Sequence, residues 1–392
     1  MTARVRVGVC ADFREEGWPS MDRVADSLIA CLARDHGGSV DAALVCPPFA
    51  RRASRLSTGR AALNVDRGWN RLWDYPRHAG RIAGQYDVFH VVDHSYSQLV
   101  LRLPASRTVV TCHDLDTFRS ILDPQAEPRS VLFRAMTRHI LAGLQRAACV
   151  TCDTTAVRDE LVGRGLVPAS RVVVAPIGVA DEFSSAPDVD ADREAARLMA
   201  APGVHDASGA IEVLHVGSTV GRKRIDTLLM AIAETRRAFP QVHLVRVGGP
   251  FTLEQERLLR DLDLVQHVTV LPSLNDRWLA AVYRRAAMVV LPSEREGFGL
   301  PVIEAMASGT PVIASDLAVL REVGGGIAAH CATGDAGAWA REMTALLRER
   351  SDAPEQWADR RHRGIVWARR FTWAAFADRM ARVYADLAAC PV

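Results

Sequence analysis

Lysine is nearly absent from this chain of 392 residues: among 48 basic residues, only Lys223 is a lysine. A strong excess of one charge is also missing. The formal net charge is +2, which excludes the electrostatic signature of a nucleic-acid-binding protein. No apolar run approaches the roughly 20 residues that a membrane-spanning helix needs. The apolar run at the start ends before Asp12 and is too short for a signal peptide. We therefore expect a cytoplasmic protein.

The eight cysteines do not form a disulfide or metal framework in the sequence. Cys149 and Cys152 make a C-x-x-C, but they lie in an apolar run that is typical of a strand. Side chains three positions apart in a strand point to opposite faces, so this pair is not expected to share a metal. We predict buried free thiols.

Short β-branched runs alternate with helical stretches through both halves of the chain. Hydrophobic residues make up 49% and charged residues 24%, as in ordinary globular proteins. This alternation predicts an α/β protein with two doubly wound parallel sheets, each covered on both faces. We place one domain at 1–183 and a second at 210–368, joined by a linker at 184–209 and followed by a C-terminal helix at 369–392. Ligands of such sheets bind after the strands, so those loops carry the candidate residues.

The first candidate motif follows the predicted strand 211–216 and reads Gly-Ser-Thr-Val-Gly-Arg-Lys-Arg at 217–224. A glycine-rich turn before a helix presents free backbone N–H groups and the positive end of the helix dipole. Arg222 and Lys223 add two cations, so the motif suits a diphosphate. A solvated basic turn fits the same residues, and the motif alone does not decide between the two.

The second candidate motif follows the predicted strand 287–291 and runs from Pro292 to Gly309. Pro301 suits the first position of a helix, so the loop 297–300 should present backbone amides at a helix start. Glu296 lies in this loop and Glu304 one turn into the helix. Carboxylates accept hydrogen bonds from sugar hydroxyls in pairs, and the turn could bring both to one ligand.

This second motif, Pro-Ser-x-x-Glu-Gly-Phe-Gly-Leu-Pro-x-x-Glu-Ala-Met-Ala-x-Gly-x-Pro-Val, resembles the signature of glycosyltransferase family 4. The resemblance covers about 211–390 closely, including Gly-Arg-Lys-Arg and the Val-Gly-Gly-Pro at 247–250. The first half matches mainly in its strand–helix rhythm. The resemblance implies the GT-B fold: two Rossmann-like domains that face a central cleft, with C-terminal helices crossing back to the first domain. It also implies retaining transfer from a nucleotide sugar.

By this resemblance, the second half would hold the donor. Glu296 would bind hydroxyls of the donor hexose, and Glu304 those of the ribose. Arg222 and Lys223 would neutralise the departing diphosphate. Seven further residues would lie in the loops around the hexose, the phosphates and the nucleobase: Gly217, Gly248, Leu271, Gly297, Phe298, Gly299 and Leu300.

Candidates in the first half are single residues rather than long motifs. His113 follows the predicted strand 107–112; a lone histidine there more often satisfies a turn, but the resemblance places it beside the transferred sugar. Asp93 and His94 follow another predicted strand, and we expect them on the acceptor side. Family members usually carry a glycine pair after the first strand, whereas this chain has Gly17 alone, which leaves its role open.

Metal binding is not expected in the chemistry. Asp114 and Asp116 form a D-x-D, but the same pattern recurs at 188–190 and 261–263, so it carries little information. The resemblance also implies no metal. We therefore predict no metal and no cofactor, with the nucleotide sugar acting as a co-substrate.

Residues 51–82 contain eight arginines and two aspartates, interleaved with Trp69 and Trp73. One interpretation is a basic aromatic patch that contacts an anionic lipid at the cytoplasmic face of the membrane, or a phosphorylated acceptor. The other is a solvated arginine-rich face. We favour the second, because no amphipathic helix longer than about 12 residues can be recognised there.

Together these features predict a retaining glycosyltransferase that moves a hexosyl group from a UDP or GDP sugar to an acceptor hydroxyl. A saccharide or lipid-linked acceptor in polysaccharide or glycolipid assembly is the first expectation, and a small natural product the second. An epimerase or phosphorylase on the same architecture, and a non-catalytic nucleotide-sugar-binding subunit, remain alternatives. No pair of carboxylates suited to double displacement is evident in the first half, so attack on the face of the leaving group fits better.

Overall fold

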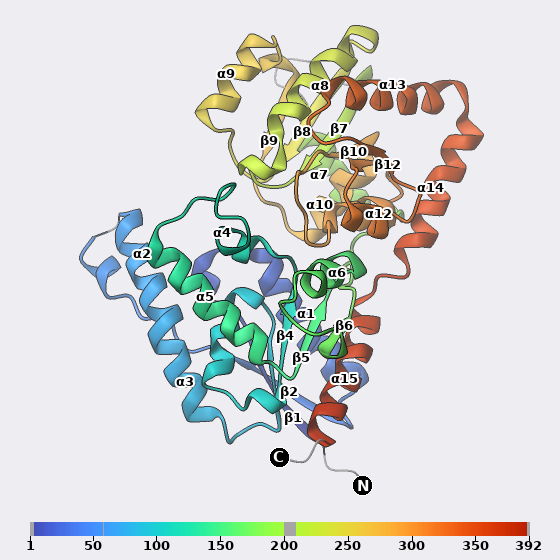
Figure 1. The fold of residues 1–392 in the computed structure, drawn as a ribbon. Coiled ribbons are helices and arrows are strands. Elements are labelled where there is room, and N and C mark those ends of the chain that lie inside the picture. Colours follow the sequence, from blue (N-terminus) through green and yellow to red (C-terminus); the bar gives the residue numbers. More distant parts are fainter. Residues whose placement is uncertain (1–3, 58, 200–208, 390–392) are drawn as a thin grey trace. The chain divides into compact units, whose positions relative to one another are not determined.

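The computed structural model describes residues 4–57, 59–199 and 209–389. The chain forms two compact units (Figure 1). The first comprises Met1–Gly178 together with Thr372–Val392, and the second comprises Val179–Phe371. The predicted separate linker at 184–209 belongs to the second unit, where helix α7 (Val189–Met199) packs on α10 (Asp276–Arg285). Residues 200–208 of that linker lie outside the described residues.

The first unit is built on a parallel six-stranded sheet in the order β2-β1-β3-β4-β5-β6. Its strands are short and rich in valine, as expected when helices cover both faces of a sheet. Their bounds are β1 Val5–Cys10, β2 Val40–Val45, β3 Val88–Val91, β4 Thr108–Cys112, β5 Cys149–Cys152 and β6 Val172–Val174. Its α-helices are α1 Pro19–Asp35, α2 Arg60–Trp69, α3 Tyr75–Ile82, α4 Arg119–Leu122, α5 Val131–Arg146, α6 Thr155–Gly163 and α15 Trp373–Ala389.

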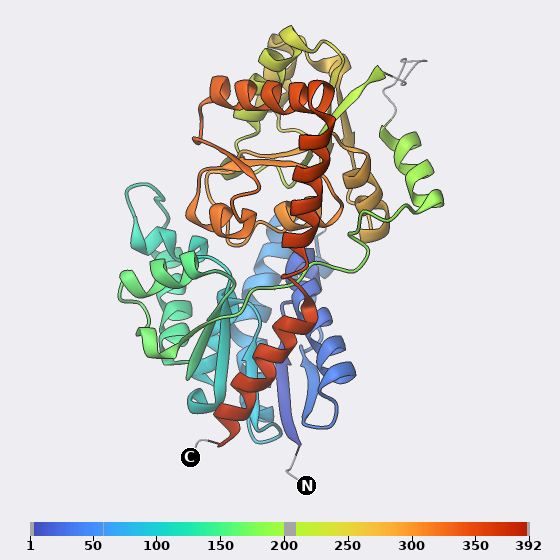
Figure 2. The same ribbon diagram turned by 90° about the vertical axis from the view of Figure 1, so that its right-hand side faces the viewer.

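Helix α15 returns the end of the chain to the first unit, where it lies along the sheet beside α1 (Figure 2). Two polar contacts fix it: the Tyr384 hydroxyl is 2.7 Å from His90 Nδ1, and Asp378 Oδ1 is 2.7 Å from His36 Nε2. At Gly178 there is no room for a side chain, because a Cβ would meet the backbone nitrogen of Trp373 at 2.1 Å. The return predicted from the sequence therefore occurs, and it begins at Thr372.

The second unit repeats the architecture, with a parallel sheet in the order β12-β11-β10-β7-β8-β9. The hydrophobic core between α8, α13 and the sheet includes Leu228, Ile232, Trp339 and Met343. The strands are β7 Ile211–Val216, β8 Val242–Val247, β9 Val268–Leu271, β10 Met288–Leu291, β11 Val312–Ser315 and β12 Ala329–Cys331. The remaining helices are α8 Ile225–Ala238, α9 Leu253–Asp261, α11 Leu300–Ala307, α12 Ala318–Gly324, α13 Ala336–Asp352 and α14 Pro354–Ala368.

Each sheet contains a point at which the strand order reverses. In the first unit this point lies between β1 and β3, and in the second between β7 and β10. Loops that leave two such neighbouring strands diverge to opposite faces, which opens a crevice at the carboxyl ends where ligands of doubly wound sheets bind. The two doubly wound sheets predicted from the sequence are confirmed, and these reversal points indicate where to look for sites.

The arginine-rich stretch forms a longer helix than its sequence indicated. Residues 60–82 are helical throughout, as α2, a π-helical turn at Asn70–Asp74 and α3. The expectation of no amphipathic helix longer than about 12 residues was wrong. Gly68 and Pro76 are residue types that usually interrupt a helix, so the sequence pattern did not indicate a continuous one. Pro76 is tolerated because it is the second residue of α3, next to the π turn, where the ladder of backbone hydrogen bonds is already shifted. Among the described helices, none is both long enough and apolar enough to cross a bilayer.

Candidate functional site

The two motifs of the second unit meet at its strand-order reversal, after β7 and β10. Lys223 Nζ lies 2.5 Å from Glu296 Oε1, and the side chains are only 11% and 8% exposed. Arg222 Nη1 donates to the carbonyl oxygen of Arg295 at 2.9 Å and lies 3.8 Å from Glu296 Oε2. The backbone N–H of Glu294 donates to the carbonyl of Arg222 at 2.7 Å, which ties the two loops together. The structure therefore assembles two cations around one carboxylate.

Three of the predicted backbone residues lie at adjoining strand ends. Gly217 follows β7, Gly248 follows β8, and Leu271 ends β9. Gly248 has φ 127°, and a Cβ there would meet the carbonyl oxygen of Gly217 at 2.3 Å. Only glycine allows this close approach of two loops. The loops after β7 and β8 are therefore held against each other beside Lys223, whose Cε would lie 3.7 Å from a Cβ on Gly217.

The loop 297–300 ends in the start of α11, as the motif predicted. Gly299 caps the helix with φ 89°, and the helix begins at Leu300, one residue before the predicted Pro301. The first amides of a helix have no partner within it, so this end can accept an anion. The side chain of Phe298 is 5% exposed and packs edge-on against the ring of Phe371, with 5.7 Å between centroids. The packing of Phe298 against Phe371 thus holds the backbone of residues 297–300 in place.

Glu304 lies deeper than Glu296. It is 4% exposed, and the hydroxyl of Tyr283 on α10 donates to its Oε2 at 2.8 Å. This contact fixes the orientation of the carboxylate. The binding of a ribose by Glu304 stays a prediction.

Arg246 was missed by the sequence reasoning. It is wholly buried in β8, and its Nη2 donates to the carbonyl oxygens of Gly217 at 2.8 Å and Gly248 at 3.4 Å. The guanidinium carbon lies 5.0 Å from the centroid of the Phe251 ring. Burial lowers the pKa of Arg246 to about 10, so it stays charged near neutral pH. The signal was present in the sequence: β8 reads Val-His-Leu-Val-Arg-Val, with an arginine in a buried strand.

Arg246 also affects the neighbouring His215. Burial lowers the pKa of His215 well below its usual range, and the charges of Arg246 and Lys223 lower it further. His215 is therefore neutral, and the positive charge at the ends of β7 and β8 resides on Arg246, Lys223 and Arg222. Such a group of positive charges suits an anionic ligand.

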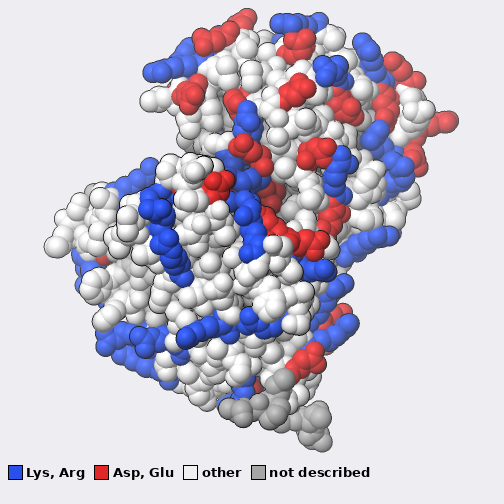
Figure 3. Space-filling model, in the orientation of Figure 1, with Lys and Arg blue, Asp and Glu red and all other residues white. Residues whose placement is uncertain are grey.

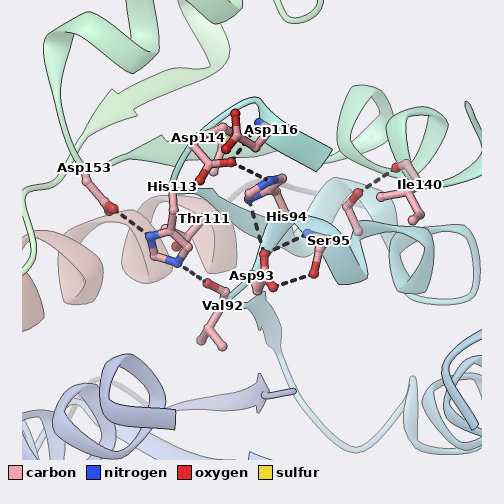
Figure 4. Close-up of polar contacts among 12 residues, drawn as sticks. Val92, Asp93, His94, Ser95, Thr111, His113, Asp114, Asp116, Ile140 and Asp153 are labelled. Carbon is pink, nitrogen blue, oxygen red and sulfur yellow. Dashed lines mark hydrogen bonds and ion pairs between the residues drawn. The ribbon is translucent and has the colours of Figure 1, made fainter. Parts of the chain in front are cut away.

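In the first unit, His113 is held from both sides (Figure 4). Its Nδ1 lies 2.6 Å from Asp153 Oδ2 at the end of β5, and its Nε2 lies 2.8 Å from the carbonyl oxygen of Val92. Both partners can only accept, so the ring donates from both nitrogens. Burial alone would lower the pKa of His113, but the carboxylate of Asp153 and its hydrogen bond outweigh it and raise the pKa to about 9. His113 is thus an imidazolium, which can offer charge but not act as a general base.

Asp93 and His94 lie next to His113 (Figure 4). Strand β3 ends at Val91, and Asp93 caps the following 3-10 helix by accepting from the backbone N–H of Ser95 at 2.8 Å. His94 Nδ1 is 3.2 Å from Asp93 Oδ1, and its Nε2 is 3.5 Å from Asp114 Oδ1. Burial would raise the pKa of Asp93, but the charges of His94 and His113 and the bonds from Ser95 lower it to about 2. The structure thus gathers all three predicted residues at one sheet edge.

Two further candidates have different outcomes. Asp12, which the sequence reasoning did not select, follows β1 at the strand-order reversal; it is 4% exposed, and neither of its carboxylate oxygens has a donor among the described residues. Gly17 has φ 75° and ends a short 3-10 helix, and a Cβ at this position would meet no atom within 4 Å. A ligand contact of Gly17 stays a prediction. Within the described part of the chain, no three His, Cys, Asp or Glu side chains are arranged to hold a metal ion.

Comparison with known proteins gives matches in both units. The family model for Glycosyltransferase Family 4 matches residues 21–183, and that for Glycosyl transferases group 1 matches residues 204–364. The D-inositol 3-phosphate glycosyltransferase of Segniliparus rotundus is 34% identical over 278 residues, which cover 63% of this chain and 60% of that protein. The phosphatidyl-myo-inositol mannosyltransferase of Mycobacterium leprae is 28% identical over 322 residues, 78% of this chain and 75% of that protein. The chain spans about 60% of the length of the inositol-phosphate relatives.

Solved structures show the same fold over nearly the whole chain. Sucrose-phosphate synthase from Thermosynechococcus elongatus has a TM-score of 0.73 at 23% identity, covering 98% of this chain and 99% of that one. HepE from Anabaena, solved with UDP and glucose, has a TM-score of 0.72 at 17% identity, covering 98% and 100%. These structures show the GT-B fold, and the two family models, which together match residues 21–183 and 204–364, show that the chain belongs to glycosyltransferase family 4.

Proposed function

We propose that this protein transfers a hexosyl group from a nucleoside-diphosphate sugar of the UDP or GDP type to an acceptor hydroxyl, with retention of anomeric configuration. The observation that carries the proposal is the pairing of Lys223 with Glu296 beside Arg222, at the strand-order reversal of the second unit. In the absence of a ligand, the carboxylate holds the lysine. When a diphosphate binds, the lysine is placed to turn to it, and Glu296 is released to accept hydrogen bonds from sugar hydroxyls.

The chemistry follows from charge development. As the bond from the anomeric carbon to the diphosphate oxygen breaks, negative charge grows on that oxygen, and Arg222, Lys223 and the amides at the start of α11 stabilise it. The acceptor oxygen forms the new bond on the same face of the sugar, and its proton passes to the departing phosphate oxygen. Because side chains supply the positive charge, we propose that no metal takes part, and that a chelator such as EDTA leaves the rate unchanged.

The acceptor is proposed to bind the first unit and to be a polyol ring. Both relatives described above carry an inositol in their names, and here Asp93 and Asp114 offer carboxylates next to His94 and His113. Such groups hydrogen-bond to ring hydroxyls. The two delivery routes that the sequence left open, a lipid-linked acceptor or a small soluble one, both remain consistent with this class.

We also propose a membrane contact through residues 51–82, the alternative that the sequence left less favoured, and three features support it. Trp69 and Trp73 are about half exposed, at 51% and 52%. A hollow of about 440 Å³ beside Trp73 is lined by Arg77, Arg81 and Arg102 and by no acidic residue. On the face shown in Figure 3, positive side chains lie over this part of the first unit with few negative ones between them. Sedimentation with anionic vesicles tests it: failure to co-sediment at low salt would exclude the contact.

The test of the proposed function is product analysis. The purified chain is incubated with UDP- and GDP-hexoses and a panel of cyclitols and saccharides, and nucleoside diphosphate and glycoside are followed by NMR. The expected result is release of one nucleoside diphosphate together with a new glycoside whose anomeric coupling matches that of the donor. A changed sugar still attached to its nucleotide would indicate an epimerase instead, and tight donor binding without turnover would indicate a binding subunit.

A further inference from the structure

A cavity of about 230 Å³ lies in the first unit, next to the carboxyl ends of β1 and β2. The loop after β1, helix α1 and the loop after β2 line it. We call it the acidic cavity, because its ionisable residues are Asp12, Arg14, Glu15, Asp22, Asp26 and Cys46. Its volume suits one six-membered ring and is too small for a long saccharide.

Negative charge in the acidic cavity exceeds positive charge. The one arginine of its lining, Arg14, is already engaged, because its Nη2 donates to both carboxylate oxygens of Asp26 at 3.1 and 2.9 Å. Asp12, Glu15 and Asp22 outnumber Arg14 in the lining, and the charge of Arg14 offsets only part of the rise in the pKa of Asp22. Nearby groups respond to this excess: burial, together with Asp26 and Glu15, raises the pKa of Asp22. Burial, together with Asp12, Glu15 and Asp22, raises that of the Cys46 thiol to about 12.

Asp12 is the residue that marks the cavity as a binding site rather than a surface cluster. It is 4% exposed, and both of its carboxylate oxygens are buried beside the carboxyl of Asp93 without a donor from the described part of the chain. Burial raises its pKa well above the usual range, and the charge of the neighbouring Asp93 and a hydrogen bond between the two carboxyl groups raise it further, whereas the charge of Arg71 lowers it. A buried carboxyl without a donor is costly, so it is expected to be completed by a ligand that donates hydrogen bonds.

We propose that the acidic cavity binds a protonated amine carried by the acceptor ring. An ammonium group brings one positive charge and three donors, which match the buried oxygens of Asp12 and the excess charge of Asp22 and Glu15. The rest of the lining is apolar, with Phe13 and Phe49 edge-on at 5.4 Å and two prolines, Pro47 and Pro48. This wall suits the C–H face of a saturated ring. The substrate class is thus an aminated polyol.

The acidic cavity lies near the other residues of the candidate acceptor site. This step of the inference rests on the proposed function. Asp12 borders Asp93, which pairs with His94 next to His113. From β1 to β4, which carries His113, the sheet order crosses two strand spacings, or about 10 Å.

This assignment separates the chain from the relatives whose names specify an inositol phosphate. A phosphate group in the acidic cavity would meet carboxylates without a free cation in the lining, and it would be repelled. An amine in the same place is attracted. The acceptor charge is therefore the property on which this chain and those relatives are expected to differ.

The experiment measures binding of three matched probes to the full-length protein by calorimetry. The probes are scyllo-inosamine, scyllo-inositol and an inositol monophosphate, which are cationic, neutral and anionic versions of one ring. We expect the amine to bind at least tenfold more tightly than the neutral ring, and the phosphate more weakly than either. Equal or tighter binding of the phosphate would overturn the proposal. Displacement of the amine by Mg²⁺ at millimolar concentration would also overturn the proposal, because it would indicate a metal site.

Variants test the location of the site. Asp12→Asn and Asp22→Asn should each reduce the preference for the amine at least fivefold, whereas Asp159→Asn should leave it unchanged. Asp159 is 61% exposed on α6, so its substitution removes the same charge at a distant place in the same unit. UDP binding to the second unit checks that each variant is folded. If the wild type binds the amine but no nucleotide, the proposed function fails while the cavity assignment stands; an unchanged preference in folded Asp12→Asn contradicts the assignment itself.

Discussion

The two units share one topology but carry opposite charge at the corresponding edge of the sheet. In the second unit, Arg222 and Lys223 lie at the carboxylate of Glu296, and the buried Arg246 donates to the carbonyl oxygen of Gly217 in the adjoining loop. In the first unit, carboxyl groups predominate: Asp12, Asp93, Asp114 and Asp153 accompany His94 and His113. The same crevice of a doubly wound sheet thus suits an anionic ligand in one unit and a neutral or cationic one in the other. The fold provides the location, and the residues after the strands decide the ligand.

The largest expected effect on activity comes from breaking the charge arrangement of the second unit. Glu296→Gln keeps the shape of the side chain but removes the charge that pairs with Lys223 and that, in the proposed function, accepts hydrogen bonds from the sugar. We expect kcat/KM for the donor to fall at least tenfold, or about 1.4 kcal/mol of transition-state stabilisation. Glu294→Gln, two residues away and exposed, serves as the control and should keep the wild-type rate. Wild-type rates in folded Glu296→Gln would contradict the role of this carboxylate.

A second substitution disrupts the close approach of the loops after β7 and β8 without changing any charge. Gly248→Ala places a Cβ 2.3 Å from the carbonyl oxygen of Gly217 at a φ of 127°. We expect the unfolding free energy to fall by about 1–3 kcal/mol, and donor binding to weaken because the loop after β7 moves. Gly221→Ala, in the same region, meets no atom within 4 Å and should change the stability by less than about 0.5 kcal/mol. Chemical denaturation measures both, and equal stability of the two variants would show that the approach is not tight.

A pH titration tests the corresponding charge of the first unit. The pKa of His113 is raised from its usual value near 6.5 to about 9, so its stabilising interaction with Asp153 is complete below pH 6.5 and is lost as the pH rises through 9. Between these values the wild type should lose about 2–3 kcal/mol more unfolding free energy than Asp153→Asn, in which His113 titrates near its usual pKa. Imidazole NMR shifts measure the two pKa values. A measured pKa of His113 below 7 in the wild type would contradict the assignment of this residue as an imidazolium.

The smallest expected effect concerns Arg246, which contacts the donor loops from behind. Arg246→Met keeps an unbranched side chain but leaves the carbonyl oxygens of Gly217 and Gly248 without their donor. We expect KM for the donor to rise three- to tenfold with little change in kcat, because the residue orders the binding loops and does not touch the reacting atoms. Steady-state kinetics separate the two constants. A lower kcat at unchanged KM would indicate a different role.

The sequence predicted the second unit far better than the first, for a physical reason. Lys223 and Glu296 lie in continuous motifs whose glycines and proline specify the local backbone, so their loops could be interpreted without knowing the sheet. Asp12 and Asp153 have no such context. Their importance depends on which strands are neighbours, and β1, β3, β4 and β5 become neighbours only in the folded sheet. Arg246 was visible in its strand, but its carbonyl partners come from the loops after β7 and β8.

The long helix at 60–82 shows a further limit of sequence patterns. Gly68 and Pro76 predict breaks, yet the chain stays helical because the π turn at Asn70–Asp74 absorbs the change in register. The buried side chain of Asn70 supports that turn: its Nδ2 donates to the carbonyl oxygens of Ala50 and Asp66 at 2.8 Å each. Such support comes from a segment 20 residues away and is not visible in the local pattern.

The most direct test of the central claim is a thermal-shift measurement of the wild type and Lys223→Met with UDP, GDP and ADP. A ligand that binds only the folded protein and is present at 100 times its dissociation constant adds about 2.7 kcal/mol to the unfolding free energy. This increase is readily measured as a rise in Tm. The account predicts a rise with one nucleoside diphosphate in the wild type and a much smaller one in Lys223→Met. No rise with any nucleotide, or an equal rise in both proteins, would contradict the claim that the second unit binds a nucleoside diphosphate through Lys223.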